Sequence, residues 1–336
     1  MRPPRVERSA QTGRRLRVLG ERLRRRLGGV TSRAFFEGLA GAARLHPAAR
    51  PERHGVEVLR DIPYRSTGRP EHLLDVYRPR ERTAPLPVIL HIHGGGFRIL
   101  SKDTHWVMGL AFARRDAVVF NVSYRLAPEH PFPAAVDDVC AAYEWVLDHA
   151  AEFGGDPSRI VVAGESAGAN LTTSVVLATT FERPEPYARR VFERGVVPVG
   201  AMPFCGLLHV SEIARFAQRR PLSPWVTDRM DEIERGYLGG DPPEHGLDLA
   251  NPLVLLESEV EPRRPLPPFF APVGTKDPIL DDTRRLERAL ARRGVACETT
   301  YYPGEPHAFH AFVFRENARR CWADAYRFVE RCTSVG

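Results

Sequence analysis

The chain has 336 residues, 43% hydrophobic and 27% charged, which are ordinary proportions for a soluble globular protein. No run approaches the roughly 20 apolar residues of a membrane-spanning helix, and five scattered cysteines without a C-x-x-C pattern suggest neither a zinc site nor a disulfide framework. The formal net charge is +6, but residues 1–50 hold thirteen arginines and three glutamates, so the basic character belongs to one end.

The first predicted element is an amphipathic basic helix within residues 11–30. Its apolar side chains recur at spacings of three and four, with arginines at most positions between them. Two interpretations are open: the arginines contact a membrane surface or another polyanion, or the leucines pack on the domain and the arginines are solvated. We expect the second. The apolar stripe consists of Leu16, Leu19, Leu23, Leu27 and Val30.

From about Pro87 onward, short β-rich runs alternate with helical stretches. This alternation indicates a mostly parallel sheet flanked by its crossover helices. Residues 205–256 have no regular pattern. Strands are predicted at 88–92, 117–122, 160–163, 196–202, 269–273 and 298–302, and helices at 134–151, 170–180 and 284–292.

Three consecutive glycines follow the first of these strands. Glycine lets the backbone approach a substrate closely and turn its N–H groups inward, as the loop that supplies half of an oxyanion hole requires. The alternative is that the three glycines form a flexible hairpin. The G-x-S-x-G motif farther along the chain disfavours this alternative. The segment consists of His93, Gly94, Gly95 and Gly96.

The strongest motif is a G-x-S-x-G segment between the strand at 160–163 and the next helix. A nucleophile on such a strand-to-helix turn needs glycines two residues before and after it, because side chains there would clash with the neighbouring strand and helix. The turn exposes the Ser166 hydroxyl at a helix N-terminus, where the helix dipole favours negative charge. A chance match is the alternative, which the flanking elements disfavour. The segment consists of Gly164, Glu165, Ser166, Ala167 and Gly168.

The general base is sought among the histidines that follow Ser166, because a nucleophile on such a strand-to-helix turn is followed along the chain by the acid and then by the histidine. Four histidines meet this condition. We expect His307, because it lies in the loop just after the last predicted strand, whereas His310 is the nearest alternative and lies farther into the next segment. The other two are His209 and His245.

The acid that orients the base is expected at the end of the preceding strand. Asp277 follows the strand at 269–273 and precedes a helix, and a carboxylate there would fix the imidazole tautomer. Asp281 and Asp282 are alternatives, although they look better suited to capping the helix that begins there.

In this order, the motifs resemble the hormone-sensitive-lipase family of esterases, which carry His-Gly-Gly-Gly ahead of the nucleophile turn. The resemblance runs from about residue 60 to the end and includes 124–129 (YRLAPE), 132–135 (FPAA) and 156–160 (DPSRI). It implies an α/β-hydrolase fold with a small helical cap. It also implies a serine carboxylesterase for short- to medium-chain acyl esters, without metal or cofactor.

The resemblance further implies that the backbone N–H groups of Gly95, Gly96 and Ala167 form the oxyanion hole. It places the cap in the N-terminal helices and in the segment near 211–237. We therefore divide the chain into residues 1–55, an N-terminal helical region that is part of the cap, and residues 56–336, a catalytic domain with a cap insertion at about 206–256. Two residues depart from the family pattern: Glu165 stands where Asp or Thr is usual, and Leu100 where glycine is common.

Several functional questions stay open at this point. The same triad would serve a deacetylase, an amidase or an acyltransferase of a small metabolite, and a non-catalytic small-molecule receptor is a further alternative that the presence of His307 disfavours. We expect a small-molecule ester as substrate, no nucleic-acid partner and a cytoplasmic location, and we leave open a homodimer and membrane-surface contact through the basic helix. Candidate pocket walls, for which core packing is an equal explanation, are Phe97, Trp106, Phe204 and Trp225.

Overall fold

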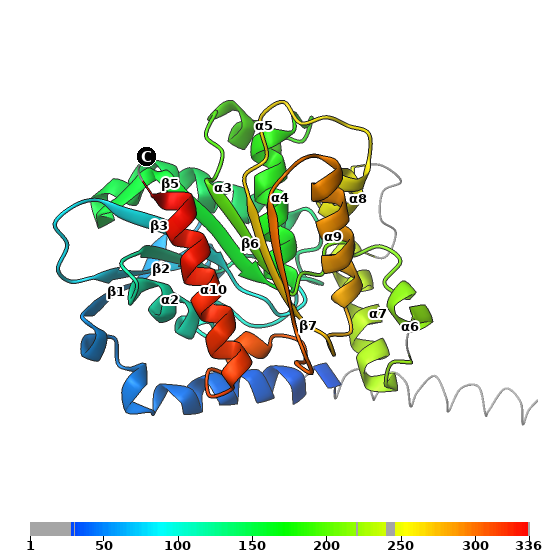
Figure 1. The fold of residues 1–336 in the computed structure, drawn as a ribbon, viewed down its shortest axis with the longest axis horizontal. Coiled ribbons are helices and arrows are strands. Elements are labelled where there is room, and N and C mark those ends of the chain that lie inside the picture. Colours follow the sequence, from blue (N-terminus) through cyan, green and yellow to red (C-terminus); the bar gives the residue numbers. More distant parts are fainter. Residues whose placement is uncertain (1–27, 30, 220, 240–245, 335–336) are drawn as a thin grey trace, which may run out of the picture.

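The computed structural model describes residues 28–29, 31–219, 221–239 and 246–334. One eight-stranded sheet runs through them in the order β1-β2-β4-β3-β5-β6-β7-β8 (Figure 1). β2 is antiparallel to both of its neighbours, and the strands from β4 to β8 are parallel. The strands are β1 (Val56–Pro63), β2 (Leu73–Pro79), β3 (Leu86–Ile92), β4 (Val118–Val122), β5 (Gly155–Glu165), β6 (Gly200–Phe204), β7 (Phe269–Gly274) and β8 (Cys297–Tyr302).

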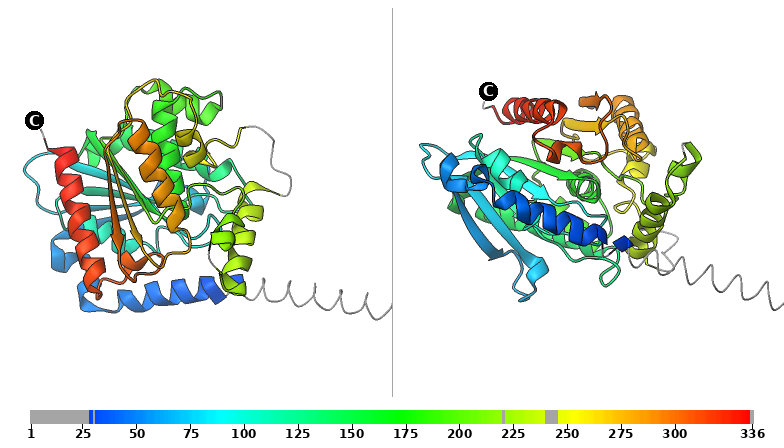
Figure 2. Two further views of the ribbon diagram at one scale, coloured as in Figure 1. Left: turned by 45° about the vertical axis from the view of Figure 1, so that its right-hand side comes forward. Right: turned by 90° about the horizontal axis from the view of Figure 1, so that it is seen from below.

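Helices cover both faces of the sheet, as Figures 1 and 2 show. The helices are α2 (Trp106–Ala113), α3 (Ala134–His149), α4 (Ala167–Thr180), α5 (Pro186–Glu193), α6 (Arg215–Arg219), α7 (Pro224–Leu238), α8 (Pro252–Glu257), α9 (Leu280–Arg292) and α10 (Glu316–Thr333). Short 3-10 turns lie at Pro47–Ala49, Pro51–His54, Pro70–His72, Ala150–Phe153 and Phe309–Ala311.

Alternate strand residues enter two separate cores. Leu90 and Ile92 of β3 pack with side chains of α3, α4, α5, α8 and α9, whereas Ile89 packs with α2 and α10. A strand that is buried on both sides reads as a continuous apolar run, which is why β3, β4 and β5 could be located from the sequence. Every residue of α4 is buried, so the helix behind the nucleophile turn is held on all sides.

The structure also contains elements that the sequence pattern did not predict. β1 and β2 precede the expected start of the sheet at about residue 87, and the segment 205–256, expected to be irregular, contains α6, α7 and α8. β5 begins at Gly155, five residues before the predicted strand, because Leu86 at the start of β3 pairs with Gly155.

The predicted basic helix at 11–30 lies outside the described residues except for Gly28 and Gly29. Residues 31–44 are helical and largely exposed, and the helix runs along one border of the molecule (Figure 2). It contacts the rest of the chain at Ala40, whose carbonyl accepts a hydrogen bond of 3.2 Å from Trp106 Nε1, and at Arg44, which pairs with Asp103 at 4.0 Å. Within the described residues, no helix combines the length and apolar character needed to cross a membrane.

Candidate active site

Ser166 lies on the sharp turn between β5 and α4. Its φ of +55° and ψ of −114° are unusual for a residue with a side chain, and such strained conformations persist where the surroundings fix them. Here the backbone N–H of Ser166 donates to Phe204 O at 2.9 Å, and its carbonyl accepts from Leu207 N at 3.2 Å. The turn is thus pinned to the end of β6, and Ser166 stays partly exposed.

The glycines on either side of Ser166 are required by space. A Cβ on Gly168 would lie 2.1 Å from Ile92 O, and one on Gly164 would lie 2.5 Å from Gly168 O. Both are far below any normal contact and both involve backbone atoms, which cannot rotate away. The expected steric reason for the G-x-S-x-G pattern is therefore present in this chain.

His307 and Asp277 lie side by side at the ends of β8 and β7. His307 Nδ1 donates to Asp277 Oδ2 at 2.8 Å, and the other oxygen of Asp277 accepts from Ile279 N at 2.9 Å. The Asp277 side chain is fully buried, whereas that of His307 is one-third exposed. With Nδ1 committed to the carboxylate, Nε2 of His307 is left as the atom that can accept a proton.

Parallel strand order brings this pair toward Ser166. β5, which ends at the nucleophile turn, neighbours β6, and β6 neighbours β7. Cys205 directly follows β6, and its sulfur lies within 4.8 Å of the donor atoms of Asp277 and His307. Since Ser166 N is hydrogen-bonded to Phe204 O, one residue before Cys205, the nucleophile turn and the His307–Asp277 pair flank the same strand end.

Opposing effects act on the proton of His307. Burial disfavours the imidazolium, but the adjacent Asp277 carboxylate and the neighbouring Cys205 sulfur together outweigh this effect, so the pKa of His307 lies well above its ordinary value. Burial also raises the pKa of the Cys205 thiol, which is therefore neutral at pH 7. An imidazole with these surroundings becomes available as a base only at a higher pH than free imidazole does.

The glycine segment adopts backbone conformations that favour glycine. Gly95 has a φ of +111° and Gly96 a φ of +61°, and a Cβ on Gly95 would lie 2.1 Å from Ile99 O. Leu100 has a φ of +74°, the left-handed region, which explains physically why glycine is common at this position in the resembling family. Its Cγ lies 3.2 Å from where a Cβ of Gly95 would be, so Leu100 packs against this loop.

Helix α7 is docked onto the same loop. Arg98 forms an ion pair of 2.7 Å with Glu232, and Phe97 stacks on Tyr237 with ring centroids 3.7 Å apart. Ile233, between these contacts, lies 2.8 Å from the position of a Cβ on Gly96. Its side chain therefore forms a wall directly beside the loop predicted to hold the oxyanion.

The alternatives for base and acid have other partners. His310 is buried and its Nε2 contacts Glu165 Oε2 at 3.2 Å. Asp282 accepts from Leu208 N and His209 N and pairs with Arg215, so it anchors the chain after β6 and does not cap α9.

The candidate pocket walls have different surroundings. Phe97, Trp106 and Phe204 are buried, and Trp225 on α7 is about half exposed. Phe97 meets α7, as described above, and Phe204 lies 4.9 Å from the ring of His310.

Two residues that the sequence reasoning passed over belong to this region. Cys205 could have been found from its place after a parallel strand, because the carboxyl ends of such strands meet at one edge. His105 is buried, and its Nε2 forms a close ion pair with Glu165 Oε1. Its sequence neighbourhood, Thr104-His105-Trp106, carries no motif, and its partner is sixty residues away.

The donor atoms of Cys205, Asp277 and His307 are close enough together to hold a metal ion. However, His307 Nδ1 and Asp277 Oδ2 are already hydrogen-bonded at 2.8 Å, and a metal between them would displace that bond. The arrangement fits an acid–base pair better than a metal centre.

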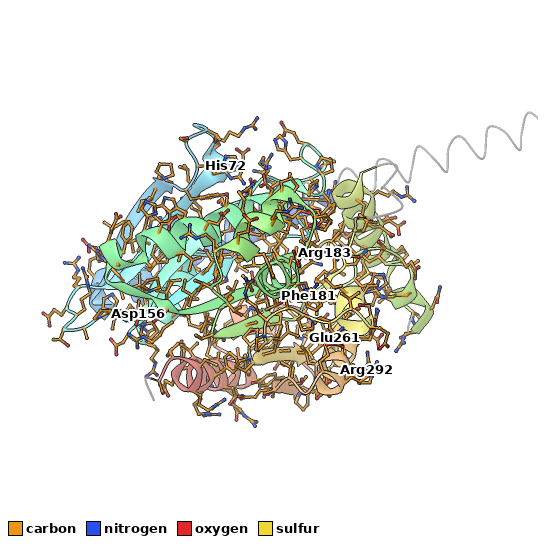
Figure 3. The ribbon with its side chains drawn as sticks, turned by 90° about the horizontal axis from the view of Figure 1, so that it is seen from above. His72, Asp156, Phe181, Arg183, Glu261 and Arg292 are labelled. Carbon is orange, nitrogen blue, oxygen red and sulfur yellow. The ribbon has the colours of Figure 1, made fainter. Side chains whose placement is uncertain are left out.

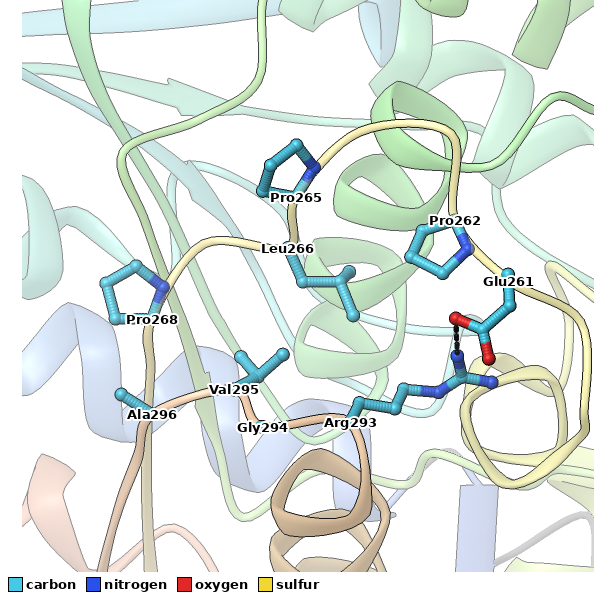
Figure 4. Close-up of a pocket in the computed structure, with 9 residues that line it drawn as sticks. All are labelled: Glu261, Pro262, Pro265, Leu266, Pro268, Arg293, Gly294, Val295 and Ala296. Carbon is cyan, nitrogen blue, oxygen red and sulfur yellow. Dashed lines mark ion pairs between the residues drawn. The ribbon is translucent and has the colours of Figure 1, made fainter.

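A separate hollow lies at the opposite ends of β7 and β8 (Figure 4). It contains one ion pair, between Arg293 and Glu261 at 3.6 Å, and otherwise mainly prolines and aliphatic side chains. Its residues precede β7 and β8, whereas Asp277 and His307 follow them, so the hollow is remote from the triad. Its lining consists of Glu261, Pro262, Pro265, Leu266, Pro268, Arg293, Gly294, Val295 and Ala296.

Comparisons with known proteins agree with this fold. Residues 89–311 match a protein family described as alpha/beta hydrolase fold. The carboxylesterase NlhH of Mycobacterium tuberculosis is 33% identical over 289 residues, which are 84% of this chain and 81% of that protein. The versiconal hemiacetal acetate esterase of Dothistroma septosporum is 28% identical over 285 residues, which are 82% of this chain and 80% of that protein.

Solved structures give the same result. A bacterial heroin esterase superposes with a TM-score of 0.72 at 26% identity, over 91% of this chain and 92% of that one. A hyperthermophilic esterase from the archaeon Pyrobaculum calidifontis superposes with a TM-score of 0.70 at 26% identity, over 91% and 94%.

Proposed function

Because the chain belongs to the α/β-hydrolase family, in its hormone-sensitive-lipase group of esterases, we propose that this carboxylesterase-type enzyme acts through a triad of Ser166, His307 and Asp277. Its substrates are short- to medium-chain acyl esters. The observation that carries the proposal is the hydrogen bond between His307 Nδ1 and the buried Asp277 carboxylate at the strand ends beside the nucleophile turn.

In the first step, Ser166 Oγ attacks the ester carbonyl carbon while His307 Nε2 takes the hydroxyl proton. The negative charge on the former carbonyl oxygen is held by the N–H groups of Gly95, Gly96 and Ala167, and each such donor contributes about 2.7–4 kcal/mol in comparable sites. The tetrahedral intermediate collapses by breaking the bond to the alcohol oxygen. His307 returns the proton to that oxygen, and the alcohol leaves.

In the second step, His307 takes a proton from water, and the water oxygen attacks the acyl-enzyme carbonyl. The bond to Ser166 Oγ breaks, and the proton on His307 passes to the serine oxygen. Asp277 keeps its charge throughout: it holds the imidazole tautomer and stabilises the imidazolium in both steps.

The test is hydrolysis of p-nitrophenyl esters from acetate to palmitate, with the wild-type protein beside Ser166→Ala. We expect a maximum at short chains and a loss of about 10⁶-fold in kcat in the variant, comparable to other serine hydrolases without their nucleophile. Ser174→Ala is the matched control, because Ser174 lies on the same helix with its hydroxyl bonded to Asn170 O and Leu249 O. Equal hydrolysis by wild type and Ser166→Ala would contradict the proposal.

A parallel measurement separates ester hydrolysis from the alternatives that the same triad would serve. Matched oxygen and nitrogen leaving groups on one acyl chain are compared, and we expect the ester to react much faster than the amide. A preferred amide, or a product that carries the acyl group on an added alcohol, would assign an amidase or an acyltransferase. We also propose a cytoplasmic location, which the five free cysteines support.

A further inference from the structure

Glu165, the residue before the nucleophile, contacts both the loop that carries the oxyanion glycines and the loop that carries His307. Glu165 is 6% exposed, and its carboxylate faces two histidines from different segments. Oε1 pairs with Nε2 of His105, and Oε2 lies 3.2 Å from Nε2 of His310. His105 ends the loop that begins with the three glycines, and His310 lies three residues after His307.

The protonation of His105 follows from its hydrogen bonds. Its Nδ1 faces the carbonyl oxygen of Ser101 at 3.2 Å and Thr104 Oγ1 at 2.9 Å. The Thr104 hydroxyl donates to Ser101 O, and in that orientation it leaves Nδ1 to donate to the Ser101 carbonyl. Nε2 faces a carboxylate, to which it donates. Two donating ring nitrogens are the hydrogen-bond pattern of an imidazolium, and the Glu165 carboxylate raises the pKa of His105 although burial opposes its charge.

Three buried ionisable groups near His105 stay neutral. Burial lowers the pKa of His91 to about 4 and that of His93 to about 3, and their rings lie 6.1 Å and 5.5 Å from that of His105. Tyr124 stacks on His93, and burial raises its pKa. The His105 charge thus has Glu165 as its counter-ion, and the pKa of Glu165, which burial would raise, is instead held well below its ordinary value by His105 and His310.

Backbone contacts join the same elements. A Cβ on Gly94 would lie 2.9 Å from Glu165 O and 3.1 Å from Glu165 Cγ, so the glycine segment lies flat on Glu165. The carbonyl of His310 accepts a hydrogen bond of 3.0 Å from Trp322 Nε1 in α10. His310 is therefore itself fixed, and its contact with Glu165 fixes the loop of His307 in turn.

From this arrangement we propose that Glu165 is a positioning residue, which clamps the oxyanion loop through His105 and the loop of the catalytic base through His310 against the nucleophile turn. The inference rests on the proposed triad. It assigns no proton-transfer step to Glu165. Its effect is on the relative placement of Ser166, His307 and the oxyanion donors, and errors of about 1 Å in such placement cost on the order of 100-fold in rate.

The experiment compares Glu165→Gln, His105→Gln and the double variant with wild type on p-nitrophenyl butyrate. Turnover is normalised to sites titrated with a fluorophosphonate. Each single variant should lose about ten-fold or more in kcat, with KM within about two-fold of wild type, because the substrate contacts remain while the catalytic groups shift. The double variant should have a kcat no lower than that of the poorer single variant, since both changes break the same interaction between Glu165 and His105.

Two further variants keep the result interpretable. His310→Gln retains an N–H donor toward Glu165 and should keep most of kcat, whereas His105→Gln retains a donor but removes the positive charge that pairs with Glu165. His72→Gln is the matched control, because His72 Nε2 contacts the buried Asp138 carboxylate at 3.0 Å. His72 directly precedes β2 and lies across the molecule from Arg292, the last residue of α9 (Figure 3). The His72→Gln variant should lower the melting temperature as the His105 variant does, with unchanged kcat.

The outcomes separate this inference from the proposed function. Ester turnover that does not depend on Ser166 would overturn the proposed esterase function. In that case the rate at which the fluorophosphonate labels Ser166 would still measure whether Glu165 positions the nucleophile turn. Wild-type kcat per titrated site in Glu165→Gln, additive losses in the double variant, or an equal loss in His72→Gln would each overturn the clamp. If Glu165→Gln does not fold, the comparison of His105→Gln with His310→Gln and His72→Gln decides.

Discussion

Asp277 determines how His307 behaves as a base. One of its oxygens holds the imidazole and the other is fixed by the backbone N–H of Ile279. Because the carboxylate raises the pKa of His307 well above its ordinary value, the enzyme has to lose a proton from His307 before it can act. Activity should therefore rise with pH through a value higher than that of free imidazole.

Asp277→Asn should reduce kcat by about 10⁴-fold, because an amide does not stabilise the imidazolium and allows the wrong tautomer. The remaining activity should begin at lower pH than in wild type, since burial, which lowers the pKa of His307, would no longer be opposed by the Asp277 charge. The measurement is kcat/KM against pH for both proteins. Asp281→Asn, the same chemical change outside the triad, should leave the pH dependence of kcat/KM unchanged. A rise in activity that begins at higher pH in Asp277→Asn than in wild type would contradict this account.

At the level of single residues, the sequence identifies groups whose function depends on a local motif. Ser166 lies between obligatory glycines, and Asp277 and His307 follow predicted strands in a fixed order. His105 could not be found in this way, because its charge depends on Glu165, sixty residues later, and on burial that appears only in the fold. The same is true of the contact between His310 and Glu165, which joins residues 145 positions apart in the chain.

At the level of elements, α7 determines the space beside the oxyanion loop. The segment that contains α7, residues 205–256, has no regular pattern in the sequence because α7 does not bury a regular apolar face. The buried residues of α7 are Asp228, Met230, Gly236, Tyr237 and Leu238. β1 and β2 were missed for a related reason. β1 lies at the sheet edge with many exposed residues, and the buried Asp75 of β2, which binds Arg60 and Lys102, interrupts the apolar pattern.

Ile233→Ala should widen the space next to Gly96. We expect the ratio of kcat/KM for longer over shorter acyl chains to rise by about ten-fold, the lower range for discrimination by one methylene in a closed pocket. The readout is the same p-nitrophenyl ester series. Val226→Ala is the matched control, since Val226 is also half-buried on α7. An unchanged chain-length profile in Ile233→Ala would show that this side chain does not limit the substrate.

At the level of the whole molecule, the five cysteines are distributed over both cores without pairing. Cys140, Cys205 and Cys321 are buried, and Cys297 and Cys332 are partly buried. Burial raises the pKa of all five thiols, those of Cys297 and Cys332 to about 11. Few thiolates are present at neutral pH, and the thiolate is the reactive form.

The folded protein should therefore react slowly with iodoacetamide at pH 7.5, and the unfolded protein should take up five labels without a reductant. Mass spectrometry of the two samples measures this directly. Treatment with a reductant before unfolding is the control and should not change the number of labels. Fewer than five labels in the unreduced sample would reveal a disulfide and would weaken the proposal of a cytoplasmic location.

The position of Cys205 affects how inhibitors of this enzyme should be interpreted. Its sulfur lies within 4.8 Å of the donor atoms of Asp277 and His307, so a mercury atom bound there would occupy the space around the base. Inactivation by a mercurial would then suggest a cysteine hydrolase, although the sulfur takes no part in the proposed chemistry. Cys205→Ala should remain active and become resistant to the reagent, so the standard classification of hydrolases by inhibitor profile would assign this enzyme to the wrong class.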